Sequence, residues 1–440
     1  MRLAHLGTLC LLGCLLAPAC RSGLSQERSP PEPAANIEKS RYAGRTQDEW
    51  SELFRTLTLS SKAAAEEVPQ LVQVLLNDDA PPALRKLAVS MLGRIGEPVR
   101  PHVPELLTLL DQTNTEFAAP TEWGLKCISL LGPVAAEATP RLAEVLQDSA
   151  RTHRERLLAI EGLGMIGPAH PRTLGLLVAE LERRSAPAST AESESATRPA
   201  NQPSESLAVA ASDAAATASE LRQSHQRNEL RVATVDMLAL FGATAAPAVP
   251  QLLKALRSDH EPLRRSAAFA LGQVGGTLGM QGLVEALLFD DSPAVQDAAG
   301  HALAKLGTPA IPRLTQLLDD REPGVRLRAV RALGQIGKLA IVAAEPLRTR
   351  LDDDSNAVRI AAAEAIWLIT GDANAARQLA MTFLDSDDRD TRRDAFLLLV
   401  LIGRSPAGAE VVAELQRLTS SDNPRLRQAA VIGLREIARP

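Results

Sequence analysis

Aromatic side chains are scarce in this 440-residue chain, where Phe, Trp and Tyr together make up 2% of the residues. Strands are enriched in aromatic and β-branched residues, whereas alanine and leucine carry the apolar content here and favour helix packed on helix. No sign of charge dominates either, because the formal net charge is only −5. The composition therefore predicts a helical protein with no bulk attraction for nucleic acid or anionic lipid.

Cysteine is also rare, with four in the chain, and three of these fall within the first 20 residues. Cys127 is the single cysteine beyond them, so no internal disulfide framework can form and stability must come from packing. The motifs HExxH, GxSxG, CxxC and the P-loop are missing, and the seven histidines do not cluster at ligand spacing. We expect no metal, no cofactor and no catalytic residue.

The first 20 residues have the pattern of a secretory signal. Arg2 is the only charged residue, a leucine-rich run follows, and the segment ends in the small-residue sequence Ala17 to Cys20. The run LLAPAC resembles a bacterial lipoprotein box with Cys20 as the lipidated residue; Cys14 is a second candidate, and simple cleavage near Ala19 is the alternative. We expect an exported protein, periplasmic or anchored to the bacterial envelope by its lipid, with residues 21–41 as a disordered tether.

One stretch organises the rest of the chain. The sequence PGVRLRAVRALGQIG, from Pro323 to Gly337, has nine further recognisable copies, and its apolar residues return at three- and four-residue spacing on one helix face. A second pattern, with proline near its start, lies between the copies, as in VPQLLKALRSD from Val249. Each unit therefore reads as a helix hairpin, and units that cannot fold alone form arrays.

The repeats fall into two groups. Residues 42–184 hold the N-terminal repeats, beginning with a capping helix around Trp50, and residues 228–440 continue the same solenoid. Between them, the Ser-, Ala- and Pro-rich residues 185–227 form a low-complexity insertion that we expect to be largely disordered, with a partner-binding loop as the alternative to a solvated one. Within it, the alanine-rich stretch from Leu207 to Leu221 is compatible with a helix.

Three features carry a resemblance to HEAT repeats, especially the short class named after phycobilisome lyases: an aspartate in the turn, an arginine in the second helix and the closing sequence ALGxIG. The resemblance implies an all-α superhelix, an α-solenoid of about ten helix hairpins. We expect the aspartate to cap the second helix and the arginine to pair with an acid of the same or the adjacent unit. The clearest members of this structural ladder are Asp259, Arg264, Asp320, Arg326, Asp353 and Arg359.

The repeat class occurs in proteins of many roles, so function is open. Deoxyhypusine hydroxylase, built from similar repeats, binds iron through several His-Glu pairs, whereas this chain has only His260-Glu261. That activity is not expected, and a lyase-like or cofactor-enzyme accessory role remains the alternative. We expect instead a non-catalytic scaffold that binds another protein on the concave face of the solenoid.

The concave face is lined by the position that Arg331 holds in its unit. Phe269, His301 and Arg331 form a mixed patch in the middle of this row, which we take as the candidate protein contact. The last two members, Leu397 and Ile432, are expected to be buried by crowding.

Overall fold

The computed structural model describes residues 41–56, 62–111, 120–183 and 203–439, with the backbone alone for residues 203–216. The predicted signal and tether, including Cys20, lie outside the described residues. In the described part of the chain, all regular elements are helices, apart from one β-bridge between Tyr42 and Arg45. None of these helices is both long and apolar enough to cross a membrane.

Ten helix pairs follow one another along the described chain, and in each pair a short first helix precedes a longer second one. The first helices are α3 (Val68–Leu76), α5 (Val103–Leu107), α7 (Thr139–Gln147), α9 (Thr173–Glu182), α11 (Val249–Leu256), α13 (Thr277–Phe289), α15 (Ile311–Gln316), α17 (Ala344–Thr349), α19 (Asn374–Phe383) and α21 (Ala409–Leu418). The second helices are α4 (Pro82–Ile95), α6 (Pro120–Leu131), α8 (His153–Ile166), α10 (Pro203–Leu240), α12 (Glu261–Val274), α14 (Pro293–Leu306), α16 (Pro323–Ile336), α18 (Asn356–Thr370), α20 (Arg389–Gly403) and α22 (Pro424–Ile437). The predicted all-α solenoid of about ten hairpins is confirmed.

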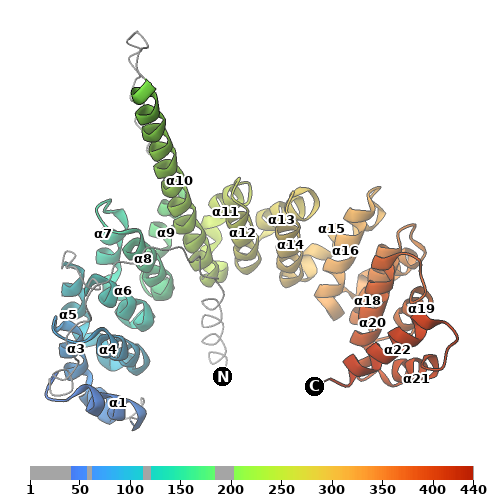
Figure 1. Cartoon of the computed structure of the whole chain (residues 1–440), viewed down its shortest axis with the longest axis horizontal. Helices are drawn as coiled ribbons and strands as arrows, with labels where there is room; N and C mark the ends of the chain where they lie inside the picture. Colours follow the sequence, from blue (N-terminus) through green and yellow to red (C-terminus); the bar gives the residue numbers. More distant parts are fainter. Residues whose placement is uncertain (1–40, 57–61, 112–119, 184–202, 440) are drawn as a thin grey trace.

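The pairs form an arch, with first helices such as α7, α11 and α15 on the outer, convex side and second helices such as α8, α12 and α16 on the inner, concave side (Figure 1). Glycine allows the inner helices to approach closely. A Cβ added to Gly272 of α12 would lie 2.7 Å from Ala302 Cβ of α14, and one added to Gly334 of α16 would lie 3.1 Å from Ala365 Cα of α18. An inner layer spaced more tightly than the outer layer bends the array.

The first helices begin with a bend of the kind that proline imposes. A 3₁₀ turn runs directly into α5, α7, α11 and α15, and each of these helices carries proline in its first turn. Proline at this point needs no N–H partner, so the ring sets the direction of the new helix. Most second helices end at a glycine with positive φ, such as Gly275 at 81° and Gly337 at 65°.

The N-terminal end of the array is closed by α1 (Gln47–Thr56) and α2 (Lys62–Glu66). Trp50 of α1 is fully buried, and its indole N–H donates to the carbonyl oxygen of Tyr42 at 2.9 Å. Thr46 and Glu49 cap α1 reciprocally, since each backbone N–H donates to the other's side chain. An aromatic residue thus covers the outer face of the first helix pair among the described residues.

The hydrophobic core divides at α18. One cluster of buried residues runs from Tyr42 to Ile369, and a second runs from Ile360 to the final pair. The position that Gly272 and Gly334 hold is occupied by Trp367 in α18, by Val400 in α20 and by Arg435 in α22. This position faces the next second helix, so Trp367 and Val400 hold α18, α20 and α22 further apart, which explains the break.

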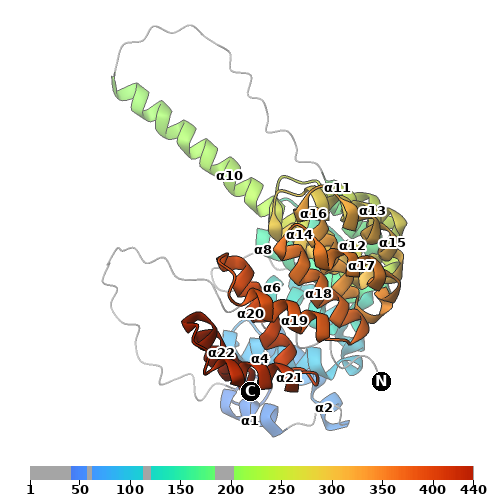
Figure 2. The ribbon, with the colours of Figure 1, turned by 90° about the vertical axis from the view of Figure 1, so that its right-hand side faces the viewer.

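Helix α10 is 38 residues long and projects from the arch (Figures 1 and 2). Residues 203–227 of the predicted insertion are part of it, including the stretch from Leu207 to Leu221, whereas residues 184–202 lie outside the described residues. Its first buried side chain among those described is Leu230. About 40 Å of helix therefore precedes the part that packs in the array, at 1.5 Å per residue.

Candidate functional site

A ladder of arginines joins successive units. We call the arginine near the start of each second helix the ladder arginine. That of α16, Arg326, donates from Nη1 to the carbonyl oxygens of Asp320 and Arg321 in its own turn, at 2.9 and 3.2 Å. From Nε and Nη2 it donates to both carboxylate oxygens of Asp353 in the next unit, at 2.8 and 2.7 Å. One guanidinium therefore satisfies one turn and one neighbouring acid at once.

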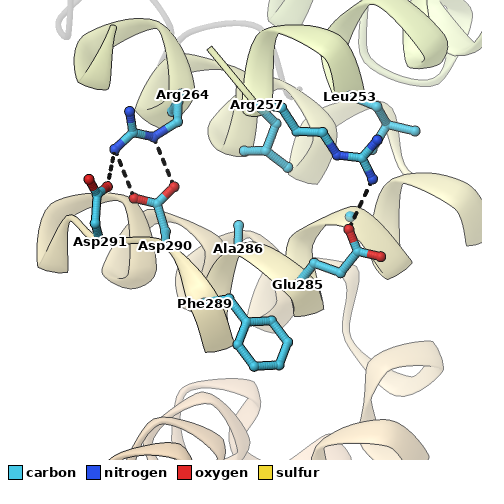
Figure 3. A pocket seen from close by; sticks show the side chains of 10 residues that line it. Leu253, Arg257, Arg264, Glu285, Ala286, Phe289, Asp290 and Asp291 are labelled. Atoms are coloured by element: carbon cyan, nitrogen blue, oxygen red, sulfur yellow. Dashed lines mark hydrogen bonds and ion pairs between the residues drawn. The ribbon is translucent and has the colours of Figure 1, made fainter. Parts of the chain in front are cut away.

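Arg264 of α12 repeats this arrangement (Figure 3). Its Nη1 donates to the carbonyl oxygens of Ser258 and Asp259, and its Nε and Nη2 donate to Asp290 at 2.9 and 3.0 Å. Asp291 accepts a further bond at 2.5 Å. Asp259 thus takes part through its backbone.

These contacts change the acidity of the carboxyl groups. Burial alone would raise the pKa of Asp353, but hydrogen bonds from Arg326 and from the Ser355 N–H outweigh it and lower the pKa to about 2. The pKa of Asp290 is lowered in the same way, by Arg264 against the effect of burial.

Asp320 and Asp353 do not cap the second helices that follow them, contrary to the sequence-based expectation. The Asp320 carboxylate accepts from the Glu322 N–H at 2.9 Å, and the Asp353 carboxylate accepts from the Ser355 N–H at 3.0 Å. Both N–H groups precede the first helical residue, because the aspartate stands too far upstream to reach the helix. The carboxylate instead closes the turn on itself.

Arg359 of α18 departs from the predicted pairing, because it has no acid partner among the described residues. Its guanidinium contacts Asn356 Oδ1 and lies over the Phe383 ring, 5.1 Å from the ring centre. The position that Asp353 holds in its turn is Ser386 in the next unit, so no carboxylate is present there. The ladder is interrupted at the helix where the core divides.

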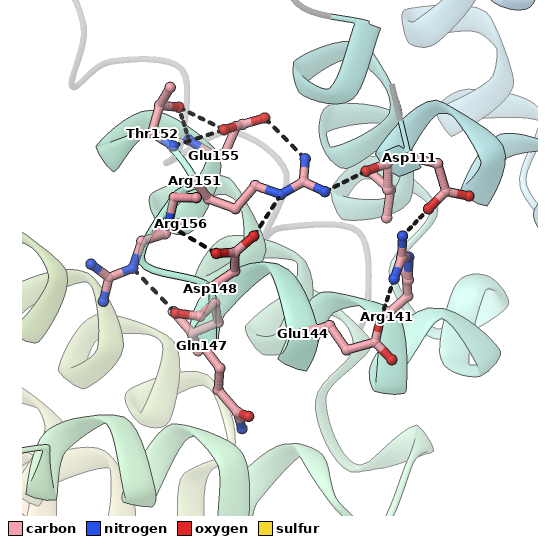
Figure 4. A network of polar contacts seen from close by, with 12 residues as sticks. Asp111, Arg141, Glu144, Gln147, Asp148, Arg151, Thr152, Glu155 and Arg156 are labelled. Carbon is pink, nitrogen blue, oxygen red and sulfur yellow. Dashed lines mark hydrogen bonds and ion pairs between the residues drawn. The ribbon is translucent and has the colours of Figure 1, made fainter. Parts of the chain in front are cut away.

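A different network joins the units of the N-terminal half (Figure 4). Arg151 donates to the Leu110 carbonyl oxygen at 2.7 Å and forms ion pairs with Asp148 and Glu155, each at 3.5 Å. Arg156, the ladder arginine of α8, donates to the Leu146 carbonyl oxygen and pairs with Glu180 of the next unit at 3.3 Å. Sequence analysis missed Arg156; the signal was its place eleven residues before a closing glycine, which Arg264 and Arg326 share.

The predicted contact residues lie five positions after the ladder position, on the concave side of α12, α14 and α16. Phe269 is 55% exposed, and His301 and Arg331 are also exposed. The structure places the three in consecutive second helices. The axes of packed helices typically lie about 8–10 Å apart. His301 Nδ1 donates to the Asp297 carbonyl oxygen of its own helix at 2.7 Å, which leaves Nε2 as an acceptor.

This row of side chains continues in both directions. Lys126 of α6, which sequence analysis left out, pairs with Glu161 of α8 at 2.9 Å. Further along, Asp236 of α10 and Glu364 of α18 have their pKa raised by burial; Ser266 and Arg265 act against the rise at Asp236. At Glu364, Arg331 opposes the rise and Asp394 adds to it. Arg331 therefore faces an acid of the next helix.

The C-terminal part of the concave side is apolar. Leu397 and Ile432, expected to be buried, are 55% and 42% exposed, so that expectation is wrong. Leu368 and Leu401 are exposed beside them, four positions further along their helices than this row. The concave row faces away from the hairpin cores in every unit, so Leu397 and Ile432 remain exposed, as Phe269 of the same row does in the closely packed α12. We call these four residues the C-terminal apolar strip.

A hollow of about 360 Å³ adjoins this strip between α20 and α22. Its apolar part is formed by Leu384, Phe396, Ala429 and Ile432. Its charged lining consists of arginines without an acidic residue: Arg389, Arg392, Arg393 and Arg425.

The described part of the chain has few other side chains suited to metal binding or to nucleophilic chemistry. In the described ranges, no three His, Cys, Asp or Glu residues are arranged to hold a metal ion. Burial raises the pKa of the Cys127 thiol to about 12, so the group remains a neutral thiol at neutral pH.

Known proteins offer one family match and several structural likenesses. No curated protein sequence matches the chain. Among solved structures, the complex of CpcE and CpcF of phycocyanin lyase from Nostoc sp. PCC7120 is similar, with 25% identity over 48% of this chain and 89% of that one and a TM-score of 0.30. Human deoxyhypusine hydroxylase in complex with glycerol is similar with 22% identity over 71% and 99% and a TM-score of 0.28, and YibA of E. coli with 18% identity over 47% and 87% and a TM-score of 0.28.

TM-scores of this size support no specific relationship with any of these proteins. The assignment of the repeat type therefore rests on the helix pairs and on the family match. That match is to the family described as HEAT repeats, over residues 280–367. These residues, from α13 to α18, hold the ladder in its regular form at Arg326 and Asp353. Residues 280–367 are therefore HEAT repeats, set within an all-α solenoid of HEAT-like helix pairs.

Proposed function

We propose that this chain is a non-catalytic scaffold that binds another protein on its concave face. The observation that carries the proposal is the C-terminal apolar strip of Leu368, Leu397, Leu401 and Ile432, four exposed apolar side chains on three adjacent second helices. Exposed apolar groups gathered on a concave surface are typical of a binding site rather than of a solvated face. Phe269, one of the three predicted contact residues, adds an aromatic side chain nearer the middle of the arch.

The chemistry of the partner follows from what surrounds the strip. The hollow between α20 and α22 adds Phe396 and four arginines beside Ile432. Arginine next to buried apolar area is a common composition of strong protein contacts. Arg393 pairs with Asp390 and Asp394, and Arg425 pairs with Asp387. Arg389 and Arg392 form no ion pair with a described acid, so a partner segment with apolar side chains and a flanking carboxylate would fit this composition best.

We place this scaffold at the bacterial cell envelope, on the strength of the signal-like residues 1–20 alone. Labelling of the full chain with radioactive palmitate in a bacterial host tests the anchor. We expect label in the wild type and in Cys14→Ser but not in Cys20→Ser. Label lost only in Cys14→Ser would move the anchor to that residue, and no label in the wild type would contradict a lipoprotein.

Affinity capture from envelope extracts tests the binding face. The first variant changes the C-terminal apolar strip and carries Leu397→Ser, Leu401→Ser and Ile432→Ser. The second variant changes the predicted contact residues Phe269, His301 and Arg331 to Ala. The control carries Leu339→Ser, Ile341→Ser and Val342→Ser, three exposed apolar side chains in the 3₁₀ turn between α16 and α17.

We expect a stoichiometric partner with the wild type and the control, and its loss from the first variant. Loss from the second variant alone would move the site to the middle of the arch. Equal recovery from all four chains, or no stoichiometric protein with the wild type, would contradict binding on the concave face.

A further inference from the structure

Arg231 of α10 is a ladder arginine whose usual partners are missing. It stands eleven residues before the closing glycine Gly242, as Arg264 and Arg326 stand before theirs. Arg231 forms no hydrogen bond or ion pair with any residue whose side chain the structure describes. It is half-buried, so its charge is partly withdrawn from water without compensation.

Two features of the sequence remove the partners. Arg264 uses carbonyl oxygens of the turn before its helix, six and five residues upstream. In α10 those positions are residues 225 and 226, which lie inside the long helix, where carbonyl groups accept from the helix itself. The acid is missing too, because the position of Asp290 and Asp353 is Ser258 in the unit after Arg231.

More positive charge surrounds the same point. Arg231 and Lys254 line a hollow of about 580 Å³, together with Ser258, Asp259 and Arg257. Arg257 pairs with Glu285 at 3.0 Å, whereas Lys254 forms no ion pair with a described residue. Asp259 is the single acid of the lining and forms no ion pair with Arg231.

One turn before Arg231, the exposed Arg227 adds another cation that pairs with no described acid. Burial lowers the pKa of Arg231, and the charge of Arg227 lowers it further, as expected where cations crowd without an acid.

We propose that this hollow, at the base of the projecting part of α10, binds a carboxylate ligand, whose carboxylate takes the place over Arg231 that Asp290 and Asp353 take over Arg264 and Arg326. The choice of carboxylate comes from the chain itself, which fills the same position with a two-oxygen contact at 2.7 to 3.0 Å in two other units. Arg231 and Lys254, the two unpaired cations of the lining, and Arg227 one turn away outweigh the single acid Asp259, which favours a ligand with two negative charges. A small dicarboxylic acid has that charge, and a pair of acidic side chains on a peptide is the other source of the same chemistry.

Thermal unfolding and titration calorimetry of the full chain test the site, with succinate and the peptide Glu-Ala-Glu as probes and ionic strength held constant with sodium chloride. Arg231→Gln removes the central cation. Ser258→Asp restores the acid of the regular ladder and keeps Arg231. Arg313→Gln is the control, since Arg313 is exposed on α15, two units away, and pairs with no described acid.

We expect succinate to bind the wild type and the control, and the dissociation constant to rise at least about tenfold in Arg231→Gln, the effect of losing one charged hydrogen-bonding group. Ser258→Asp should unfold at a higher temperature than the wild type without ligand and should not bind succinate. A response to the peptide and not to succinate assigns the site to an acidic segment of a protein.

Three results would overturn the proposal: no binding of either probe by the wild type, equal binding by Arg231→Gln, or succinate binding retained in Ser258→Asp. Because Ser258→Asp keeps Arg231 and adds an ion pair, it remains informative if Arg231→Gln fails to fold. The site is separate from the concave face, so its failure would leave the proposed scaffold function untouched.

Discussion

Arg326 and Asp353 show how this array tolerates charge in its interior. Their side chains are 7% and 2% exposed, yet each has its hydrogen-bonding groups satisfied by the other and by the two turns they join. A buried ion pair of this kind adds little net stability, but the loss of one partner leaves the other charged and buried. We infer that the pair fixes how one unit is set against the next.

The lowered pKa of Asp353 makes the stability of the array depend on pH. A carboxyl whose folded pKa is about 2, below its ordinary value of 3.8, stabilises the folded state above pH 4, and this contribution is lost as the pH falls through about 2. The contribution is roughly 2 kcal/mol. Urea unfolding at pH 5 and at pH 2 should therefore show a smaller loss of stability in Asp353→Asn than in the wild type. Equal losses in the two proteins would contradict this assignment.

The contacts of ladder residues in the regular units could be predicted from the sequence, whereas those of residues in the irregular units could not. Arg264 and Arg326 stand out because a turn aspartate and a closing glycine flank them. Arg231 has the same spacing to its glycine, but the insertion removed the turn that identifies the others. The exposure of Leu397 was predicted wrongly, because its row faces away from the hairpin cores in every unit, as the exposed Phe269 of the same row shows.

At the scale of helices, the sequence predicts the presence of a helix more reliably than the residues at which it begins and ends. Proline in the first helices and glycine after the second helices gave the hairpins correctly, since both act through the local backbone. The 3₁₀ turns before the first helices were not expected. Helix α10 extends from its packed C-terminal part into the low-complexity region. Composition alone does not predict how far a helix continues into such a region.

Two glycines in helices offer a matched test of helix spacing. Gly272→Ala places a methyl group 2.7 Å from Ala302 Cβ and should push α12 away from α14, lowering stability by about 1–3 kcal/mol. Gly175→Ala, in α9, meets nothing within 4 Å and should raise stability by about 0.5–1 kcal/mol through helix propensity. The two variants would be compared by urea unfolding. A result in which both changes are stabilising would show that the inner helices are not in close contact at Gly272.

At the scale of the whole molecule, the division of the core at α18 predicts two steps in unfolding. Units contact only their neighbours, so a weak junction lets one side open while the other stays folded. Hydrogen exchange in moderate urea should show amides of α20 and α22 exchanging before those of α12 and α16.

Trp367→Gly restores the residue type that α16 has at this contact, and we expect it to leave exchange in α12 unchanged. Simultaneous exchange of all four helices in the wild type would mean that the array unfolds as one cooperative unit.

The same junction gives the arch a mechanical property. Successive units are connected in series, so a force that pulls the two ends apart is transmitted through every contact between second helices. The contacts made through glycine, as between α12 and α14, resist separation more than the contact between α18 and α20, where Trp367 takes the place of glycine. Under tension the arch would therefore first widen at one end, and a cargo seated on the C-terminal apolar strip would be released while the rest of the arch kept its curvature.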